Sequence, residues 1–530
     1  MSSQAFSAGR VAVATAASRV TGFVRTVVLA GILGASAVAD AYNGANTFPN
    51  MVYAVLLGGV LSSVVVPVLA RSRLRGRVDD EAFVQRLLVV SVLGMLTITA
   101  CVVAAAPWIA GAFVAERPQR DLATAWSYMF LPQVLFYGVA AMATAILQVR
   151  NRFGAPAWAP VVNNVIVIAT VVVFVAVPGP AVLTPSTINS AQLAVLGAGT
   201  TLGIIGQSLW CVVLLRRSGF RWRWRVRLLP YTWRPLVVGS SMAGWVFVYV
   251  AASQVGVAVV TRAAFDHQSV SAYTYADLLL QMPYGILAVS ILTVLTPRIA
   301  NAVAADHTAT LRAQLRTGAR YLLALSIPVA GALAVFAPTA ATLVFVGNID
   351  SEQARQIGQA VAASAFGLPF LALVMLQLRV FYGQGDTRTP ALINVAMVSV
   401  KVSAITVGIH ALNGIPVVVV LCASGALSYL VGAVAGHLIL RHRFGLLGFR
   451  RVAETSARAG LLTLCAAVSA LGTMWAADQS SPTTDTVITN ILTLGAGTLL
   501  STCVFAYLLR IVRIPEVTHA GRLAMRLASR

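Results

Sequence analysis

The chain has 530 residues, of which 58% are hydrophobic and only 10% are charged, and its formal net charge is +22. A soluble protein carries roughly 25% charged residues, so this composition excludes an ordinary water-soluble globular fold and indicates that the lipid bilayer is the solvent. The positive charge alone would also suit a nucleic-acid partner, but the distribution of the arginines argues against one.

The sequence predicts an all-α polytopic membrane protein with fourteen transmembrane helices, because apolar stretches long enough to cross hydrocarbon recur along the whole chain. The predicted spans are 11–34, 43–70, 87–115, 122–148, 157–177, 190–215, 236–261, 270–297, 321–346, 356–378, 390–410, 416–440, 459–477 and 487–509. With the N-terminus inside, the cytoplasmic segments hold 31 arginines, and the outside connections hold only Arg117, Arg120, Arg262 and Arg355. This bias predicts a multi-pass protein with both termini in the cytoplasm.

The first span contains two arginines, Arg19 and Arg25, within the stretch SRVTGFVR. On an insertion scale, two mid-span arginines cost about 5 to 7 kcal/mol, which nearly cancels the contribution of the apolar residues of this span. Snorkelling to the headgroups is an alternative for Arg19, but Arg25 could snorkel only outward, on the side where this sequence avoids arginine. We therefore predict an anion site, because a planar guanidinium matches a phosphate. The two lie about 120° apart on a straight helix, so we expect a bend at Gly22.

An internal repeat divides the chain. The segments ADAYNGANTFPN and YADLLLQMPY each place an Ala-Asp pair, at Asp40 and Asp277, before a proline, and the two prolines are 234 residues apart. The prolines that end RNRFGAP and GDTRTP have the same offset. An even number of spans per copy predicts two six-helix lobes in a parallel pseudo-twofold repeat, with a site between them. Asp40 and Asp277 are either counter-ions or helix caps.

The predicted organisation has five parts: an N-lobe, a basic cytoplasmic linker, a C-lobe, two further helices and a basic cytoplasmic tail. They occupy residues 1–215, 216–235, 236–440, 441–512 and 513–530. The linker alternates Arg and Trp, which is typical of a segment at the membrane interface.

Lys401 is the only lysine of the chain and lies in the middle of a predicted span. It is either an internal cation at an ion-coupling position or a paired structural lysine. The five cysteines are scattered, and we expect no metal site and no cofactor. Asp79, Asp80 and Glu81 suit the first turn of a helix better than catalysis, and we expect no catalytic residues and no enzyme activity.

The region from SRVTGFVR to SSVVVPVLA closely resembles the opening of the MurJ (MviN) lipid II flippases. NRFGAPAWAPVVNN, YTYADLLLQMPYGILAVSILTVLTPRIA and VFYGQGDTRTPALIN extend the resemblance through both halves. These proteins belong to the multidrug/oligosaccharidyl-lipid/polysaccharide exporter superfamily. The resemblance implies that the chain flips lipid II, the undecaprenyl-diphosphate-linked disaccharide-peptide precursor of peptidoglycan, to the outer leaflet of the bacterial plasma membrane. It further implies alternating access, a role in cell-wall biogenesis and cell shape, and a lipid-tail groove in 441–512.

The resemblance places Arg19 and Arg25 on the diphosphate ligands and Asp40 on an aspartate at the outer end of the cavity. Gly22, Asn50, Tyr53 and Asp277 complete the predicted substrate-binding set. The chain departs from its relatives where they carry further arginines and acids near these positions; the residues found there are Thr26, Tyr53, Ala54, Gly58, Leu278 and Gln281. Because cations and anions are lost together, Arg19 and Arg25 become the core of the predicted site.

Other functions stay open. The altered cavity charges also fit export of another polyprenyl-diphosphate-linked saccharide, and the basic tail fits a scaffold that recruits cell-wall synthesis proteins. Arginines in the cavity argue against an exporter of cationic drugs. A membrane glycosyltransferase would need an acidic cluster that binds metal at the membrane face, and only residues 79–81 offer one. The scarcity of lysine suggests a GC-rich, actinobacterial source, where relatives often continue past the position of Arg530 into a kinase-like region.

Overall fold

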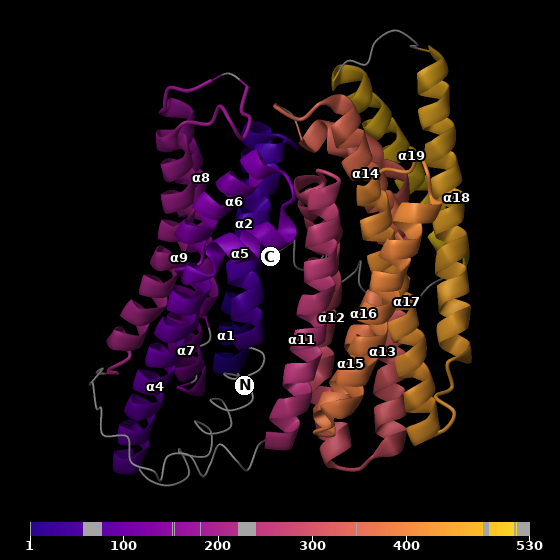
Figure 1. Ribbon diagram of the computed structural model, residues 1–530. Coiled ribbons are helices and arrows are strands. Elements are labelled where there is room, and N and C mark those ends of the chain that lie inside the picture. The colour runs from indigo at the N-terminus through magenta and orange to yellow at the C-terminus, as the bar shows by residue number, and fades with distance from the viewer. Residues whose placement is uncertain are drawn as a thin grey trace. The chain divides into compact units, whose positions relative to one another are not determined.

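The computed structural model describes residues 2–56, 77–150, 152, 154–180, 182–220, 240–345, 347–480, 487–512 and 516. Every regular element among these residues is a helix (Figure 1). The predicted all-helical class is therefore confirmed. The chain divides into two compact units, Met1–Ser271 and Ala272–Arg530, each of which is described by itself.

Unit 1 contains nine α-helices and one short 3-10 helix among its described residues, and the start of a tenth α-helix. They are α1 (Ser2–Leu33), α2 (Ala37–Val55), α4 (Arg77–Ala104), α5 (Ala106–Phe113), α6 (Arg117–Phe130), α7 (Gln133–Val149), η2 (Pro156–Trp158), α8 (Ala159–Ala176), α9 (Ser190–Arg217) and α11 (Ser240–Asp266), followed by the first two residues of α12 (Val270–Ala304).

Unit 2 contains the rest of α12 and seven further helices among its described residues. They are α13 (Thr308–Val344), α14 (Ser351–Ala365), α15 (Gly367–Gly383), α16 (Arg388–Ala411), α17 (Val417–Phe444), α18 (Arg450–Ser480) and α19 (Val487–Val512).

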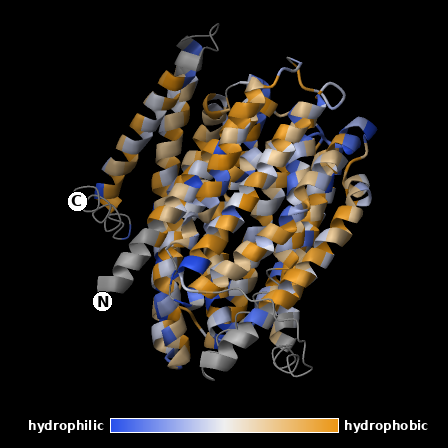
Figure 2. Ribbon diagram, turned by 90° about the vertical axis from the view of Figure 1, so that its left-hand side faces the viewer, coloured by the Kyte–Doolittle hydropathy of each residue, from blue (hydrophilic) through white to orange (hydrophobic). Residues whose placement is uncertain are grey.

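The described helices are those of a multi-pass membrane protein. Eleven are long and apolar enough to cross a membrane, or up to 13 spans if the bent pairs α4–α5 and α14–α15 each count as one. Large apolar side chains such as Val175 (68% exposed) and Leu499 (69% exposed) cover their outer faces, which suits lipid and not water. Hydrophobic residues run along the helices in Figure 2, and hydrophilic ones gather toward the helix ends. Part of the second predicted span lies outside the described residues, so the total of fourteen stays a prediction.

The interior of unit 1 is built around aromatic side chains. Tyr42 of α2 packs edge-on against Trp126 and Phe130 of α6, with ring centroids 5.5 Å apart in both pairs. The Tyr42 hydroxyl lies 2.6 Å from the hydroxyl of Thr200, so its polar atom is satisfied in the core. These contacts fix α2 against α6 and α9.

Unit 2 has a core in which α12, α13, α15 and α17 meet, with Leu315, Leu376 and Phe381 fully buried. Close helix approach depends on small residues. A methyl group at Gly358 of α14 would lie 2.4 Å from the Ala337 carbonyl of α13. The α18–α19 pair packs on α13 (Figure 1).

The GDTRTP motif forms a structural cap between α15 and α16. Asp386 accepts hydrogen bonds from the Thr389 backbone N–H (2.9 Å) and hydroxyl (2.6 Å), and it pairs with Arg443 at 2.7 Å. Burial alone would raise the pKa of the Asp386 carboxyl, but these hydrogen bonds and the Arg443 charge outweigh burial and hold the pKa below its ordinary value. The motif therefore joins α16 to α17.

We expect Asp386→Ala to lower the free energy of unfolding by about 1.5 kcal/mol at neutral pH, because a helix cap and an ion pair are lost together. A carboxyl whose pKa is lowered on folding stabilises the fold above its unfolded pKa, and this contribution disappears as pH falls through the folded pKa. Unfolding in detergent at neutral and acidic pH tests this expectation. Glu454→Ala is the matched control, because its partner Arg450 has a side chain 93% exposed. An equal loss in both variants would contradict the cap.

Candidate functional site

The two arginines of SRVTGFVR lie on α1, which runs without a break from Ser2 to Leu33. Arg19 and Arg25 are both half-buried. In each, the Nε atom is buried and has no hydrogen-bond partner among the described residues. Buried guanidinium nitrogens are normally paired, so two Nε atoms on a membrane helix that lack a partner among the described residues are suited to an anion that arrives from outside the protein.

Asn164 of α8 fixes the stretch of α1 between these arginines. Its Nδ2 atom donates to the Ser18 carbonyl (3.2 Å) and to the Thr21 hydroxyl (3.0 Å). A methyl group on Gly22 would lie 3.4 Å from the same nitrogen. α1 is continuous through Gly22, and the glycine leaves room for the Asn164 amide.

Two tyrosines of unit 1 lie within electrostatic range of Arg25. The Arg25 charge interacts electrostatically with the phenols of Tyr42 and Tyr137. Tyr53 stacks on Tyr137 with ring centroids 4.8 Å apart. The aromatic pair is linked to Arg25 through Tyr137.

Asp40 has a local structural role in unit 1. It is 1% exposed, and its Oδ1 accepts a 2.7 Å hydrogen bond from the Ser271 backbone N–H in the first turn of α12. The first N–H groups of a helix have no partner within it, so this carboxylate caps α12. Asn50 is exposed and donates to the Asn46 carbonyl of its own helix at 2.8 Å.

Asp277 and Lys401 come together in unit 2, on α12 and α16. Each is half-buried, and their charges interact, although no direct ion pair joins them among the described residues. Gln281 donates a hydrogen bond to Asp277 Oδ2, and Lys401 Nζ lies 5.9 Å from the centre of the Tyr273 ring. The only lysine of the chain therefore has a carboxylate to balance it at the same depth.

Unit 2 also carries an open groove of about 160 Å³ between α13, α18 and α19. Small and apolar residues line it, among them Gly331, Ala466 and Phe505. Its polar contributions are hydroxyls such as that of Ser501, and no charged side chain takes part. This lining suits a hydrocarbon chain.

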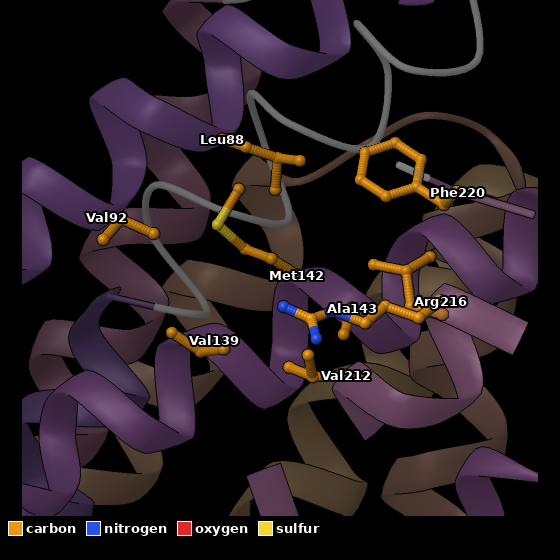
Figure 3. Close-up of a pocket in the computed structure, with 9 residues that line it drawn as sticks. Leu88, Val92, Val139, Met142, Ala143, Val212, Arg216 and Phe220 are labelled. Atoms are coloured by element: carbon orange, nitrogen blue, oxygen red, sulfur yellow. The ribbon is translucent and has the colours of Figure 1, made fainter. Parts of the chain in front are cut away.

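A smaller cavity of about 50 Å³ lies in unit 1 between α4, α7 and α9. Its lining is apolar apart from Arg216, whose guanidinium reaches among Met142, Ala143 and Val212 (Figure 3). A volume of this size holds one or a few water molecules, so it is not a site for a sugar diphosphate.

Two residues near the arginines, Asn164 and Tyr137, had no predicted role. Asn164 belongs to NRFGAPAWAPVVNN, but nothing in that motif says which helix its amide meets. Tyr137 lies in an apolar run without a distinguishing pattern. Only the packing of α7 and α8 brings them to α1 and α2.

We expect Asn164→Leu to impair transport by about tenfold while leaving Arg19 and Arg25 in place, because the α1 stretch that carries them loses both hydrogen bonds. Flipping in reconstituted vesicles measures the loss. Asn164→Gln keeps the amide at a longer reach and should recover part of it. Wild-type transport by Asn164→Leu would exclude this positioning role.

Two guanidinium Nε atoms without a partner among the described residues, an internal Asp–Lys couple and eleven or more helices able to cross a membrane are features typical of a multi-pass membrane transporter. The family model described as "Lipid II flippase MurJ" matches residues 29–500, and the chain belongs to this family.

Two relatives illustrate the membership. A probable lipid II flippase MurJ of Rhizobium meliloti (strain 1021) is 27% identical over 407 residues, which cover 74% of this chain and 72% of the relative. A lipid II flippase MurJ of Burkholderia cenocepacia is 28% identical over 402 residues, which cover 73% and 74% of the two chains.

Two solved structures share the fold. The structure of a lipid II flippase MurJ in an inward closed conformation has a TM-score of 0.71 at 19% identity and covers 95% of this chain and 99% of its own. An inward-facing multidrug resistance MATE family transporter of the MOP superfamily has a TM-score of 0.62 at 15% identity, with 82% and 96% covered. The family expected from the sequence is confirmed by the family model, and the actinobacterial source stays a prediction.

Proposed function

We propose that this protein moves lipid II from the inner to the outer leaflet of the bacterial plasma membrane, and that Arg19 and Arg25 bind its diphosphate. The observation that carries the proposal is the pair of buried, unpartnered guanidinium Nε atoms on α1. A diphosphate supplies the missing acceptors, and each guanidinium can meet it through two hydrogen bonds. The family membership, with relatives named lipid II flippases, supports this substrate.

The predicted lobes, 1–215 and 236–440, would rock in alternating access around the site. The Lys401 charge would be balanced within the second lobe by Asp277, at a position that is either structural or coupled to an ion. The groove between α13, α18 and α19 supports the prediction that the segment 441–512 holds the lipid tail, because hydrocarbon gains nothing from charged surroundings.

The arginine bias of the sequence supports an orientation with both termini in the cytoplasm. In that orientation an inside-negative potential favours outward movement of the diphosphate, by about 2.3 kcal/mol per charge per 100 mV. Recruitment of cell-wall synthesis proteins by the tail 513–530 is a further part of the proposal, and nearly all of this tail lies outside the described residues.

A second candidate substrate is another polyprenyl-diphosphate-linked saccharide. The stacked Tyr53–Tyr137 pair supports this candidate, because the resemblance to the MurJ flippases implies an arginine at the position of Tyr53. The diphosphate contacts would be the same, and only the contacts to the sugar or peptide would differ.

Flipping by the purified chain in proteoliposomes tests both substrates. We expect accessible lipid II to accumulate in the outward leaflet, faster with an inside-negative potential. An excess of unlabelled lipid II should compete better than an undecaprenyl-diphosphate sugar without the peptide. Equal competition would assign the broader substrate class, and no flipping of either lipid would refute the proposal.

A further inference from the structure

Three arginines form a row on one face of α13. Arg312, Arg316 and Arg320 follow one another at intervals of four residues, in RAQLRTGAR. Four residues advance a helix by about 6 Å and return to nearly the same face. The row therefore extends over about 12 Å, from the start of α13 toward its apolar part.

Arg320, the innermost of the three, is fully partnered. It forms an ion pair with Glu516, which is only 4% exposed, and its Nε donates to the Thr455 hydroxyl at 3.3 Å. A carboxylate and a hydroxyl thus bind the guanidinium nitrogens of this arginine within the protein.

Arg312 and Arg316 have no such partners among the described residues. The Nε of Arg312 is buried and makes no hydrogen bond, and the Nε of Arg316 donates only to the Arg312 carbonyl at 3.3 Å. No acidic side chain forms an ion pair with either arginine in the part of the chain that the structure describes. Two adjacent, partly buried positive charges are thus left without an anion.

The connection between α17 and α18 borders these two guanidiniums. Gly445 and Gly448 have φ angles of 72° and 66°, which favour glycine. A methyl group at Gly448 would lie 3.1 Å from Nη1 of Arg316, and one at Gly445 would lie 3.5 Å from Nη2 of Arg312. The backbone of the connection therefore lies directly beside both guanidiniums, with the tighter approach at Gly448.

We propose that Arg312 and Arg316 bind the phosphate of an anionic phospholipid. Two guanidiniums four residues apart can share the phosphate oxygens. A lipid is favoured over a free phosphate because exposed apolar surface adjoins the site: Leu446, within the connection, is 75% exposed. About 16 Å and more farther along α18, Leu461 and Leu464 are exposed at 57% and 61%, where the acyl chains of a lipid could extend. Basic pockets between membrane helices are suited to such headgroups.

Lipid retention by the purified full-length chain, measured by native mass spectrometry, tests the site. The probes are dioleoylphosphatidylglycerol, dioleoylphosphatidylcholine and inorganic phosphate. We expect the wild type to retain phosphatidylglycerol in preference to phosphatidylcholine, and R312Q/R316Q to bind phosphatidylglycerol about 30-fold more weakly. R450Q is the matched control, since the Arg450 side chain is 93% exposed, and it should stay within about twofold of the wild type.

Unchanged retention in R312Q/R316Q, or an equal loss in R450Q, would overturn the site. Inorganic phosphate that displaces phosphatidylglycerol at equal concentration would assign the site to free phosphate and refute the lipid. If R312Q/R316Q does not elute as a monodisperse protein, the single variants R312Q and R316Q replace it, each with an expected loss of about fivefold.

Discussion

Arg25→Ala and Arg19→Ala should each reduce flipping at least about 30-fold while the protein remains folded. Truncating one partner of a buried, hydrogen-bonded charge pair costs about 2 to 5 kcal/mol, and here the other partner is the substrate diphosphate. Neither Nε has a protein partner among the described residues, so removing the side chain breaks no hydrogen bond at that atom. The free energy of unfolding should therefore change little or even rise.

Arginine-to-lysine variants separate charge from geometry at the same positions. Lysine keeps the positive charge but loses the planar fork, so we expect a loss of about tenfold, smaller than for alanine. Flipping in proteoliposomes and unfolding in detergent are measured on the same preparations. Arg450→Ala, far more exposed, should leave both unchanged. Undiminished flipping in both alanine variants of α1 would remove the assigned anion site.

Lys401→Met should destabilise the protein by about 2 kcal/mol, and Asp277→Asn in the same chain should restore most of the loss. Removing one charge of a buried pair leaves the other uncompensated, which costs 3 to 5 kcal/mol in a fully buried site. The smaller figure applies here because both side chains are only half-buried and no direct ion pair joins them. A double-mutant cycle of unfolding free energies measures this coupling.

The same cycle decides between the two functions considered for Lys401. If the lysine only balances Asp277, the double variant should fold and flip its substrate at nearly the wild-type rate. If the pair couples transport to an ion, the double variant should fold normally and still fail to flip. Additive losses of stability in the two single variants would show that the residues do not interact.

Much of the fold was predictable because membrane helices are specified by local composition. A stretch of apolar residues about 20 long must satisfy its backbone internally, so it forms a helix whatever its neighbours are. Arg19 and Arg25 stand out for the same reason, since a charge in hydrocarbon is costly in any fold. The offset of 234 residues between matching motifs likewise needs only the sequence.

Side-chain partners could not be predicted, because they depend on which helices meet. The sequence leaves two roles open for Asp40, a counter-ion or a helix cap. The hydrogen bond that it accepts from the Ser271 backbone N–H identifies it as a cap. Lys401 finds its balancing carboxylate on α12, more than a hundred residues earlier in the chain. Asn164 reaches α1 from α8.

The sequence by itself determined that this is a helical membrane protein with charges placed at a cost on its first span. The tertiary structure decided which of its charges are satisfied. Arg320 and Arg312 occupy equivalent places in one row of α13, yet Glu516 neutralises the first and no described residue neutralises the second. The spacing of residues along a helix sets the face on which a charge lies, but the anion that meets it comes from a distant part of the chain or from outside the protein.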